Sequence, residues 1–143
     1  MNHRLILLFC LVFQWYSSHC IDHYDIVVIA LSMPKNLDRR NSVRNGWHAS
    51  SKFDGIHSTI KFVVSANDEG ISDSSFTEES TIHNDIIFCA VPSGFQNIVR
   101  KVSCGMKYML QSYTFDFLLK TDDDSTICLG PLLNHLYSQH PSL

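Results

Sequence analysis

The stretch FDFLLKTDDDSTI, residues 115–127, places three consecutive aspartates directly after an apolar segment. Residues 115–120 have the length and composition of a strand buried in a sheet. Two like charges about 4 Å apart repel by about 4 kcal/mol near a protein surface, so adjacent carboxylates favour a nearby cation. Mg²⁺ and Mn²⁺ prefer carboxylate oxygens and often bind through one or two of them plus substrate phosphates. The alternative is a solvated acidic turn in which one aspartate caps the next helix.

Segments of strand length alternate with helical patterns along the chain. The expected strands are 25–31, 59–65, 85–91 and 115–120. The first, DIVVIAL, is continuously apolar and β-branched, which is typical of a strand buried on both faces of a parallel sheet. This alternation predicts an α/β fold with a mostly parallel sheet and flanking helices. Ligands of such sheets bind outside the carboxyl ends of the strands, where the triple aspartate lies.

The clearest helix is expected over residues 94–112, where apolar residues recur at helical spacing. Ser93 and Gln96, three residues apart, predict a capping box at its start. Gly105 inside the helix is expected to cost about 1 kcal/mol relative to alanine. The apolar stripe is expected to pack into the core and consists of Phe95, Ile98, Val99, Val102, Met106, Met109 and Leu110.

Two further helices are expected, over residues 35–47 and from Gly130-Pro131 onward, because proline is favoured at an early helical position. Residues 66–84 are interpreted as a polar stretch without a predicted element. The first helix carries Arg39, Arg40 and Arg44, and Arg40 and Arg44 share a face because they are four residues apart. A phosphate bound near a metal would need such cations. The alternative is a solvated basic helix face.

Composition narrows the class of protein. A chain of 143 residues with 45% hydrophobic and 17% charged residues is expected to form one globular domain. Its formal net charge of −3 and pI near 6.2 argue against a general nucleic-acid-binding protein.

The N-terminus indicates entry into the secretory pathway. Arg4 precedes the apolar residues 5–13, a run too short for a membrane-spanning helix of roughly 17–25 residues. The run suits the core of a signal peptide, and residues 18–20, Ser-His-Cys, suit a cleavage site. Residues 1–20 are therefore interpreted as a signal peptide or, alternatively, a short uncleaved signal anchor. A buried core helix is the third alternative.

The five cysteines form neither a CxxC pair nor a zinc-binding spacing. In an oxidising compartment some can pair, but Cys89, Cys104 and Cys128 are an odd number in the body of the chain. One of them then has a partner outside the body or is a free buried thiol. Cys89 lies in an expected apolar strand, where plain packing is the preferred interpretation.

Three segments together resemble a known family. RRNSVRNGW at 39–47 resembles the RRxxIRxTW segment of the β-1,3-galactosyltransferase-like glycosyltransferases, the hexosyltransferases of glycosyltransferase family 31. FQNIVRK at 95–101 is similar to their YxNLTxK segment, and FLLKTDDD at 117–124 to their FxxKTDDD segment. The three segments occur in the family's order and at a plausible spacing. Four residues depart from it: the family has Thr, Tyr, Thr and Asp at the positions of Gly46, Phe95, Val99 and Ser93.

The resemblance implies a GT-A-like, Rossmann-like fold, with residues 25–143 forming the N-terminal, nucleotide-sugar-binding part of a catalytic domain. It implies a UDP-sugar donor and a Mn²⁺ ion that Asp122 and Asp124 hold against the diphosphate. The catalytic base is expected beyond Leu143, in a C-terminal half. The residues that the resemblance assigns to donor binding are Arg39, Arg40, Arg44, Asn97, Lys101, Asp122 and Asp123.

The activity implied is the β-1,3 transfer of galactose, N-acetylglucosamine or N-acetylgalactosamine to an acceptor glycan hydroxyl in protein glycosylation. The acceptor glycan would sit on a glycoprotein, glycolipid or proteoglycan. The family implies a Golgi membrane protein with a lumenal catalytic domain, anchored by its N-terminus, and cleavage of that segment would instead give a secreted protein. Two alternatives remain: a truncated, non-catalytic secreted protein that retains UDP-sugar and metal binding, and a metal-dependent phosphohydrolase.

Overall fold

The computed structural model describes residues 22–52 and 54–141. The expected signal peptide or anchor, residues 1–20, lies outside this range. Within the described range, no helix is long and apolar enough to cross a membrane.

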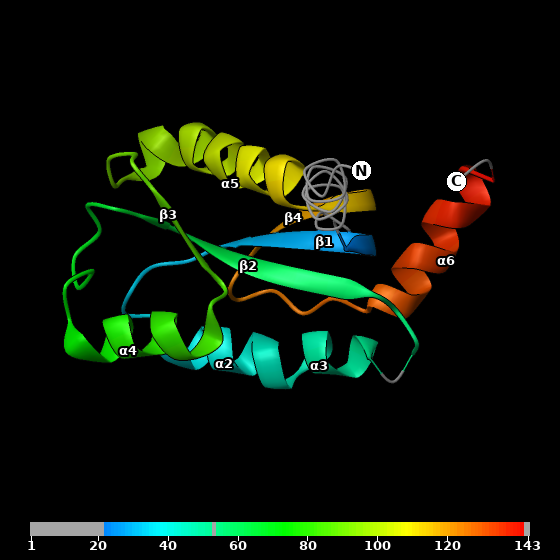
Figure 1. Cartoon of the computed structure of the whole chain (residues 1–143), viewed down its shortest axis with the longest axis horizontal. Coiled ribbons are helices and arrows are strands. Elements are labelled where there is room, and N and C mark those ends of the chain that lie inside the picture. The colour runs from blue at the N-terminus through cyan, green and yellow to red at the C-terminus, as the bar shows by residue number, and fades with distance from the viewer. Residues whose placement is uncertain (1–21, 53, 142–143) are drawn as a thin grey trace, which may run out of the picture.

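The described residues build a sheet of four parallel strands in the order β3-β2-β1-β4 (Figure 1). The predicted α/β fold with a parallel sheet is therefore confirmed. The strands are β1 (His23–Leu31), β2 (Ser58–Ser65), β3 (Ile86–Cys89) and β4 (Thr114–Asp122). β3 is shorter than expected. β4 runs into the aspartates because its pairing with β1 continues to the Leu31–Asp122 pair.

Helices cover both faces of the sheet (Figure 1). α2, α3 and α4 lie on one face and α5 on the other, while α6 lies near one end. The helices are α2 (Leu37–Asn45), α3 (Trp47–Ser51), α4 (Ser74–His83), α5 (Ile98–Ser112) and α6 (Leu129–Gln139), with a 3₁₀ turn, η1 (Phe95–Asn97), before α5.

The helix expected over 35–47 is two helices that meet at Gly46. A Cβ atom on Gly46 would lie 2.4 Å from the carbonyl oxygen of Ser42, so a larger residue would require the backbone to shift. α4 occupies the stretch that was interpreted as polar and without an element. Its only buried side chains are Phe76 and Glu79, and this explains why the apolar pattern is too sparse to indicate a helix.

The core has two layers, one on each face of β1. Ile26 and Val28 pack with Trp47 and the α6 side chains on one face, whereas Val27 and Ile29 pack with Met109 of α5 on the other. This arrangement explains why the sequence of β1 is apolar without alternation.

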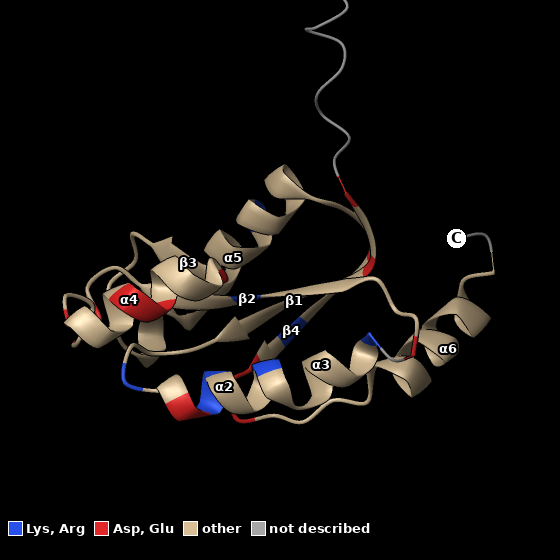
Figure 2. Cartoon of the chain, turned by 60° about the horizontal axis from the view of Figure 1, so that its bottom comes forward, with Lys and Arg blue, Asp and Glu red and all other residues tan. Residues whose placement is uncertain are grey.

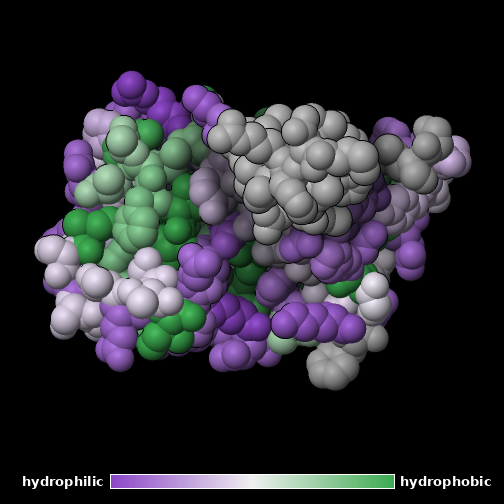
Figure 3. Space-filling view, in the orientation of Figure 1, coloured by the Kyte–Doolittle hydropathy of each residue, from purple (hydrophilic) through white to green (hydrophobic). Residues whose placement is uncertain are grey.

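The apolar stripe of α5 does not pack into the core as a whole, and that expectation was wrong. Met109 is fully buried, but Phe95 in the preceding turn is 87% exposed, Val99 78% and Leu110 68%. In the space-filling view, apolar surface gathers at the end of the molecule where β3 and the start of α5 lie (Figure 3). The apolar arc of this helix is wider than the face that contacts the sheet.

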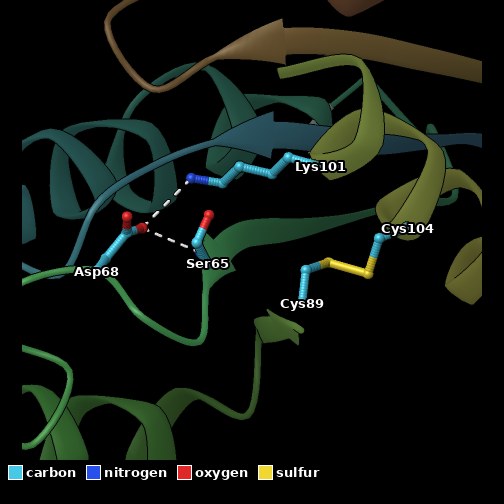
Figure 4. The surroundings of a disulfide bond; sticks show 5 residues. All are labelled: Ser65, Asp68, Cys89, Lys101 and Cys104. Atoms are coloured by element: carbon cyan, nitrogen blue, oxygen red, sulfur yellow. Dashed lines mark hydrogen bonds and ion pairs between the residues drawn. A yellow bond between two sulfur atoms is a disulfide. The ribbon is translucent and has the colours of Figure 1, made fainter. Parts of the chain in front are cut away.

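α5 is joined to the sheet covalently as well as by packing. Cys89 at the end of β3 forms a disulfide with Cys104 of α5 (Figure 4), so the interpretation of Cys89 as a plain packing residue was wrong. Next to it, a Cβ on Gly105 would lie 2.7 Å from Val63 Cγ2, so glycine allows the close approach of α5 to β2. The third body cysteine, Cys128, is a free thiol, but it is exposed rather than buried.

The capping box predicted from Ser93 and Gln96 is absent from the described start of α5. Neither η1 nor α5 has a side-chain cap, and the Ser93 hydroxyl instead donates to Asp68. The cause is tertiary: the loop after β2 offers Ser93 a charged acceptor, and hydrogen bonds to charged groups are the stronger ones.

Candidate functional site

The candidate site lies at the carboxyl edge of the sheet, where the strand order reverses. The chain proceeds from β1 to β2 to β3, and β4 then lies on the other side of β1. In open α/β sheets this reversal opens a crevice that binds ligands. A pocket of about 430 Å³ lies there, lined by residues at or after the carboxyl ends of all four strands.

The three aspartates that line this pocket differ in exposure. Asp123 is 5% exposed, whereas the side chains of Asp122 and Asp124 are 53% and 61% exposed. This matches the alternation expected along an extended chain. Asp123 Oδ2 accepts hydrogen bonds from Ser32 Oγ at 2.7 Å and Asn36 Nδ2 at 2.8 Å, so its carboxylate ties the loop after β4 to the loop after β1.

Cations of the chain itself offset the repulsion among these carboxylates. Lys120 Nζ donates to Asp122 Oδ1 at 2.9 Å. Arg39 Nη1 lies 3.3 Å from an oxygen of Asp123 and 3.3 Å from one of Asp124. These pairs are exposed on at least one side, and solvent screens them accordingly.

The two exposed carboxylates suit a metal that is completed by a ligand. Among the described residues, no group of three or more His, Cys, Asp or Glu side chains could hold a metal ion by itself. Mg²⁺-like ions usually keep several waters and bind through one or two carboxylates plus phosphates. Asp122 and Asp124 are therefore of the right chemistry to supply part of such a coordination shell at the pocket edge.

Arg40 does not reach the pocket. It is fully buried, and an arginine has five N–H donors, all of which are used here inside the protein. Two donate to Glu79 at 2.7 and 2.6 Å, and one to Ser32 Oγ at 2.8 Å. The others donate to the backbone carbonyls of Met33 and Pro34. No N–H remains for a phosphate.

Arg44 also faces inward. Its guanidinium donates twice to Asp85 at 2.8 Å and lies 2.8 Å from Glu79. Burial alone would raise the pKa of Glu79, but hydrogen bonds and charge from Arg40 and Arg44 outweigh it and hold that pKa below its usual value. Figure 2 shows the basic residues on α2 and the acidic residues on α4. Of the three predicted arginines, the structure brings only Arg39 to the pocket. The other two belong to an ion cluster made of Arg40, Arg44, Glu79 and Asp85.

The other two residues assigned to donor binding line the pocket. Lys101 Nζ donates to the backbone oxygen of Ser32 at 2.7 Å and lies 3.5 Å from Asp68 Oδ2 (Figure 4). Asn97 Nδ2 donates to the carbonyl of Ser93 at 3.3 Å. The catalytic base expected after Leu143 lies outside the described residues.

Sequence reasoning missed Asp68, Ser32 and Asn36, which also line the pocket. Asp68 is buried and accepts a hydrogen bond from the backbone N–H of Ser65 at 3.0 Å. The signal was present, because Asp68 follows the second strand as the aspartates follow the fourth. The carboxyl ends of parallel strands meet at one edge of the sheet.

A second pocket of about 400 Å³ is lined by other residues, among them Asp25, Asp54 and Tyr137. Hydrogen bonding to Asp116 and burial raise the pKa of Tyr137, so its hydroxyl stays protonated. None of the predicted site residues lines this pocket, and the pocket beside the aspartates is therefore the candidate site.

Comparison with known proteins places this sequence in a family. The sequence model described as Galactosyltransferase matches residues 38–142, a range that contains all three motifs. The chain belongs to the galactosyltransferase family. The resemblance stated from the three segments is thereby confirmed.

Within the galactosyltransferase family, the chain is 28% identical over 120 residues to mouse β-1,3-galactosyltransferase 6, covering 82% of this chain and 37% of that protein. It is 36% identical over 66 residues to mouse UDP-GalNAc:β-1,3-N-acetylgalactosaminyltransferase 2, covering 46% and 13%. It is 25% identical over 115 residues to human β-1,3-galactosyltransferase 1, covering 78% and 34%. The match thus spans 37% or less of the length of each of these relatives.

Proposed function

We propose that this chain is the nucleotide-sugar-binding part of a hexosyltransferase that uses a UDP-sugar donor and a divalent metal, with Mn²⁺ as the expected ion. The observation that carries the proposal is the pocket at the strand reversal, which is lined by the exposed Asp122 and Asp124 and by Arg39, with Arg39 in contact with Asp124. Carboxylates for a metal and an arginine for phosphate are the groups that a nucleoside diphosphate requires.

The roles of the side chains follow from their positions. A bound divalent metal supplies Lewis-acid stabilisation of the charge on the departing diphosphate. Asp122 and Asp124 would hold that metal, and Asp123 keeps their loop in place. Arg39 is half exposed and able to turn toward a phosphate, because its present contacts at 3.3 Å are long for charge-assisted hydrogen bonds. Lys101 and Asn97 line the pocket on the α5 side.

The finer assignments also belong to the proposal. The names of the relatives support galactose or N-acetylgalactosamine as the transferred sugar and a β-1,3 linkage, and N-acetylglucosamine is the third candidate. A glycan on a glycoprotein, glycolipid or proteoglycan is the proposed acceptor. The Cys89–Cys104 disulfide supports an oxidising compartment, such as the Golgi lumen or the cell exterior, because disulfides persist there.

Calorimetric titration of the 143-residue chain with UDP, with and without Mn²⁺, tests the proposal. We expect binding that requires the metal and that Asp124→Asn weakens about tenfold or more, as loss of a charged ligand contact does. Asp22→Asn is the matched control, because Asp22 precedes β1 at the opposite edge of the sheet. Equal UDP affinity with and without Mn²⁺, or an unchanged affinity in Asp124→Asn, would contradict the metal role.

A transfer assay distinguishes the proposed enzyme from the non-catalytic binding protein. The chain is incubated with labelled UDP-galactose, Mn²⁺ and a panel of acceptor glycans, and labelled product is measured. If the chain binds UDP in a metal-dependent way but neither transfers the label nor releases UDP from the donor, a binding protein is favoured over an enzyme. No observation favours the phosphohydrolase alternative over these two.

A further inference from the structure

A line of four buried polar side chains connects α4 to the aspartate loop. Glu79 is 5% exposed, Arg40 0%, Ser32 3% and Asp123 5%. The contacts along the line are 2.6 and 2.7 Å from Arg40 to Glu79, 2.8 Å from Arg40 to Ser32, and 2.7 Å from Ser32 to Asp123. Every link is therefore short, and at most 5% of any member is exposed to solvent.

The guanidinium of Arg40 is fixed on all sides. Glu79 holds it by a two-pronged contact, which fits the planar fork of arginine. The ring of Phe76, also on α4, lies 5.3 Å from its central carbon. Because all of its N–H groups are engaged within the protein, Arg40 connects parts of the chain and has no N–H left for a ligand.

The direction of the Ser32 hydroxyl proton depends on Arg40. A serine hydroxyl has one proton to donate and accepts through its lone pairs. Arg40 Nη1 donates to this oxygen and also to the carbonyl of Met33, which is the other acceptor near Ser32. The hydroxyl proton is thereby directed to Asp123 Oδ2.

Asp123 in turn determines which way its neighbours face. Its carboxylate is held by Ser32 and Asn36, and its backbone N–H donates to the carbonyl of Leu31 at 3.2 Å. With Asp123 held inward, alternation directs Asp122 and Asp124 outward to the pocket edge. Without Ser32, the carboxylate would keep only Asn36 and the half-exposed Arg39 as side-chain partners.

We infer that Glu79 is a positioning residue for the aspartate loop and acts through Arg40 and Ser32 on Asp123. α4 thus contributes to the pocket without lining it. The consequence for ligand binding rests on the proposed function, whereas the consequence for the loop does not.

The first test measures backbone amide hydrogen exchange in the ligand-free, full-length chain, with Ser32→Ala as the variant. We expect the amides of Asp123 and Ser125, which donate to Leu31 and Asp122, to exchange about tenfold faster, while the β2 amides keep their rates. Ser138→Ala is the matched control, because this exposed serine of α6 donates to a backbone carbonyl away from the pocket. Unchanged exchange at Asp123, or an equal increase throughout the sheet, would overturn the inference.

The second test asks whether Glu79 acts through Ser32. Glu79→Gln and Ser32→Ala are compared singly and together, with exchange at Asp123 as the readout. A chain of contacts predicts that Glu79→Gln alone speeds exchange at Asp123, and that the double variant exchanges no faster than the faster single variant. Unchanged exchange in Glu79→Gln would overturn the inference. If the fold increases in the exchange rate of the Asp123 amide multiply in the double variant, Glu79 acts independently of Ser32. That result would overturn the inferred chain of contacts. Should Glu79→Gln not fold, Glu79→Asp replaces it in the same comparison, since it keeps the charge and shortens the reach.

The third test uses UDP and Mn²⁺. Ser32→Ala is expected to weaken metal-dependent UDP binding about tenfold, and Ser138→Ala to leave it unchanged. If the unmutated chain binds no UDP, the proposed function fails and the exchange measurements still decide the inference. If Ser32→Ala loosens the loop and UDP affinity is unchanged, the positioning role is refuted for the ligand site.

Discussion

Removing the Cys89–Cys104 disulfide is expected to destabilise the fold and loosen one wall of the pocket. The bridge closes a loop with a sequence separation of 15 residues. The entropy that such a loop loses in the unfolded chain corresponds to about 3 kcal/mol at 25 °C. For a domain of this size, that free energy lowers the unfolding temperature by about 10 °C.

The effect is also expected to be local, because the closed loop carries Asn97 and Lys101. The thermal unfolding of the Cys89→Ser/Cys104→Ser variant is compared with that of the unmutated protein, with circular dichroism as the probe. Cys128→Ser is the control, since this thiol is free and exposed. Peptide mapping without reduction verifies the bridge. A fall of the unfolding temperature no larger than in the control, or a map that pairs Cys89 with another cysteine, would refute the reasoning.

Further predictions concern the ion cluster and the helix packing. Arg40→Ala is expected to cost about 3–5 kcal/mol in chemical denaturation, because it leaves the buried Glu79 with one fewer partner, whereas Arg39→Ala should change stability by less than about 0.5 kcal/mol and weaken UDP binding. Equal losses of stability in Arg40→Ala and Arg39→Ala would contradict the structural role of Arg40 and the ligand-binding role of Arg39. Gly105→Ala is expected to cost about 1–3 kcal/mol despite the better helix propensity of alanine, because the new Cβ meets Val63; a stabilised variant would contradict the close approach. The lowered pKa of Glu79 means that its contribution is complete above its ordinary value of 4.5 and is lost as the pH falls through the lowered pKa. As the pH is lowered through that acid range, the denaturation midpoint of Glu79→Gln should fall less steeply than that of the unmutated protein. Parallel curves for the two proteins would show that another group is responsible for the pH dependence.

Local patterns were sufficient to predict the strands and the edge where the pocket lies. β1 is apolar on both faces, so its burial between two layers of helices in a parallel sheet follows from composition alone. The distinction between Asp123 and its two neighbours likewise follows from the alternation of an extended chain. These features depend on residues close together in the sequence.

The rest depends on tertiary contacts that no local pattern contains. Helical periodicity identified α5 but did not indicate how wide a face the sheet would cover, and Phe95 and Val99 remained exposed. Arg40 could not be assigned to the interior because its partner Glu79 lies on α4, a helix with too few apolar residues to be recognised. The Cys89–Cys104 pairing likewise depends on how α5 crosses the sheet.

β4 lies at one edge of the described sheet, with a paired neighbour only on the β1 side. Its outer row of backbone donors and acceptors is therefore a template onto which another chain could add a strand. The strand carries Asp116, Lys120 and Asp122, and charged side chains on an edge oppose such growth. Asp122 belongs both to this edge strand and to the acidic loop, so its charge has a second consequence: besides suiting a metal, it opposes the pairing of β4 with a strand of another chain.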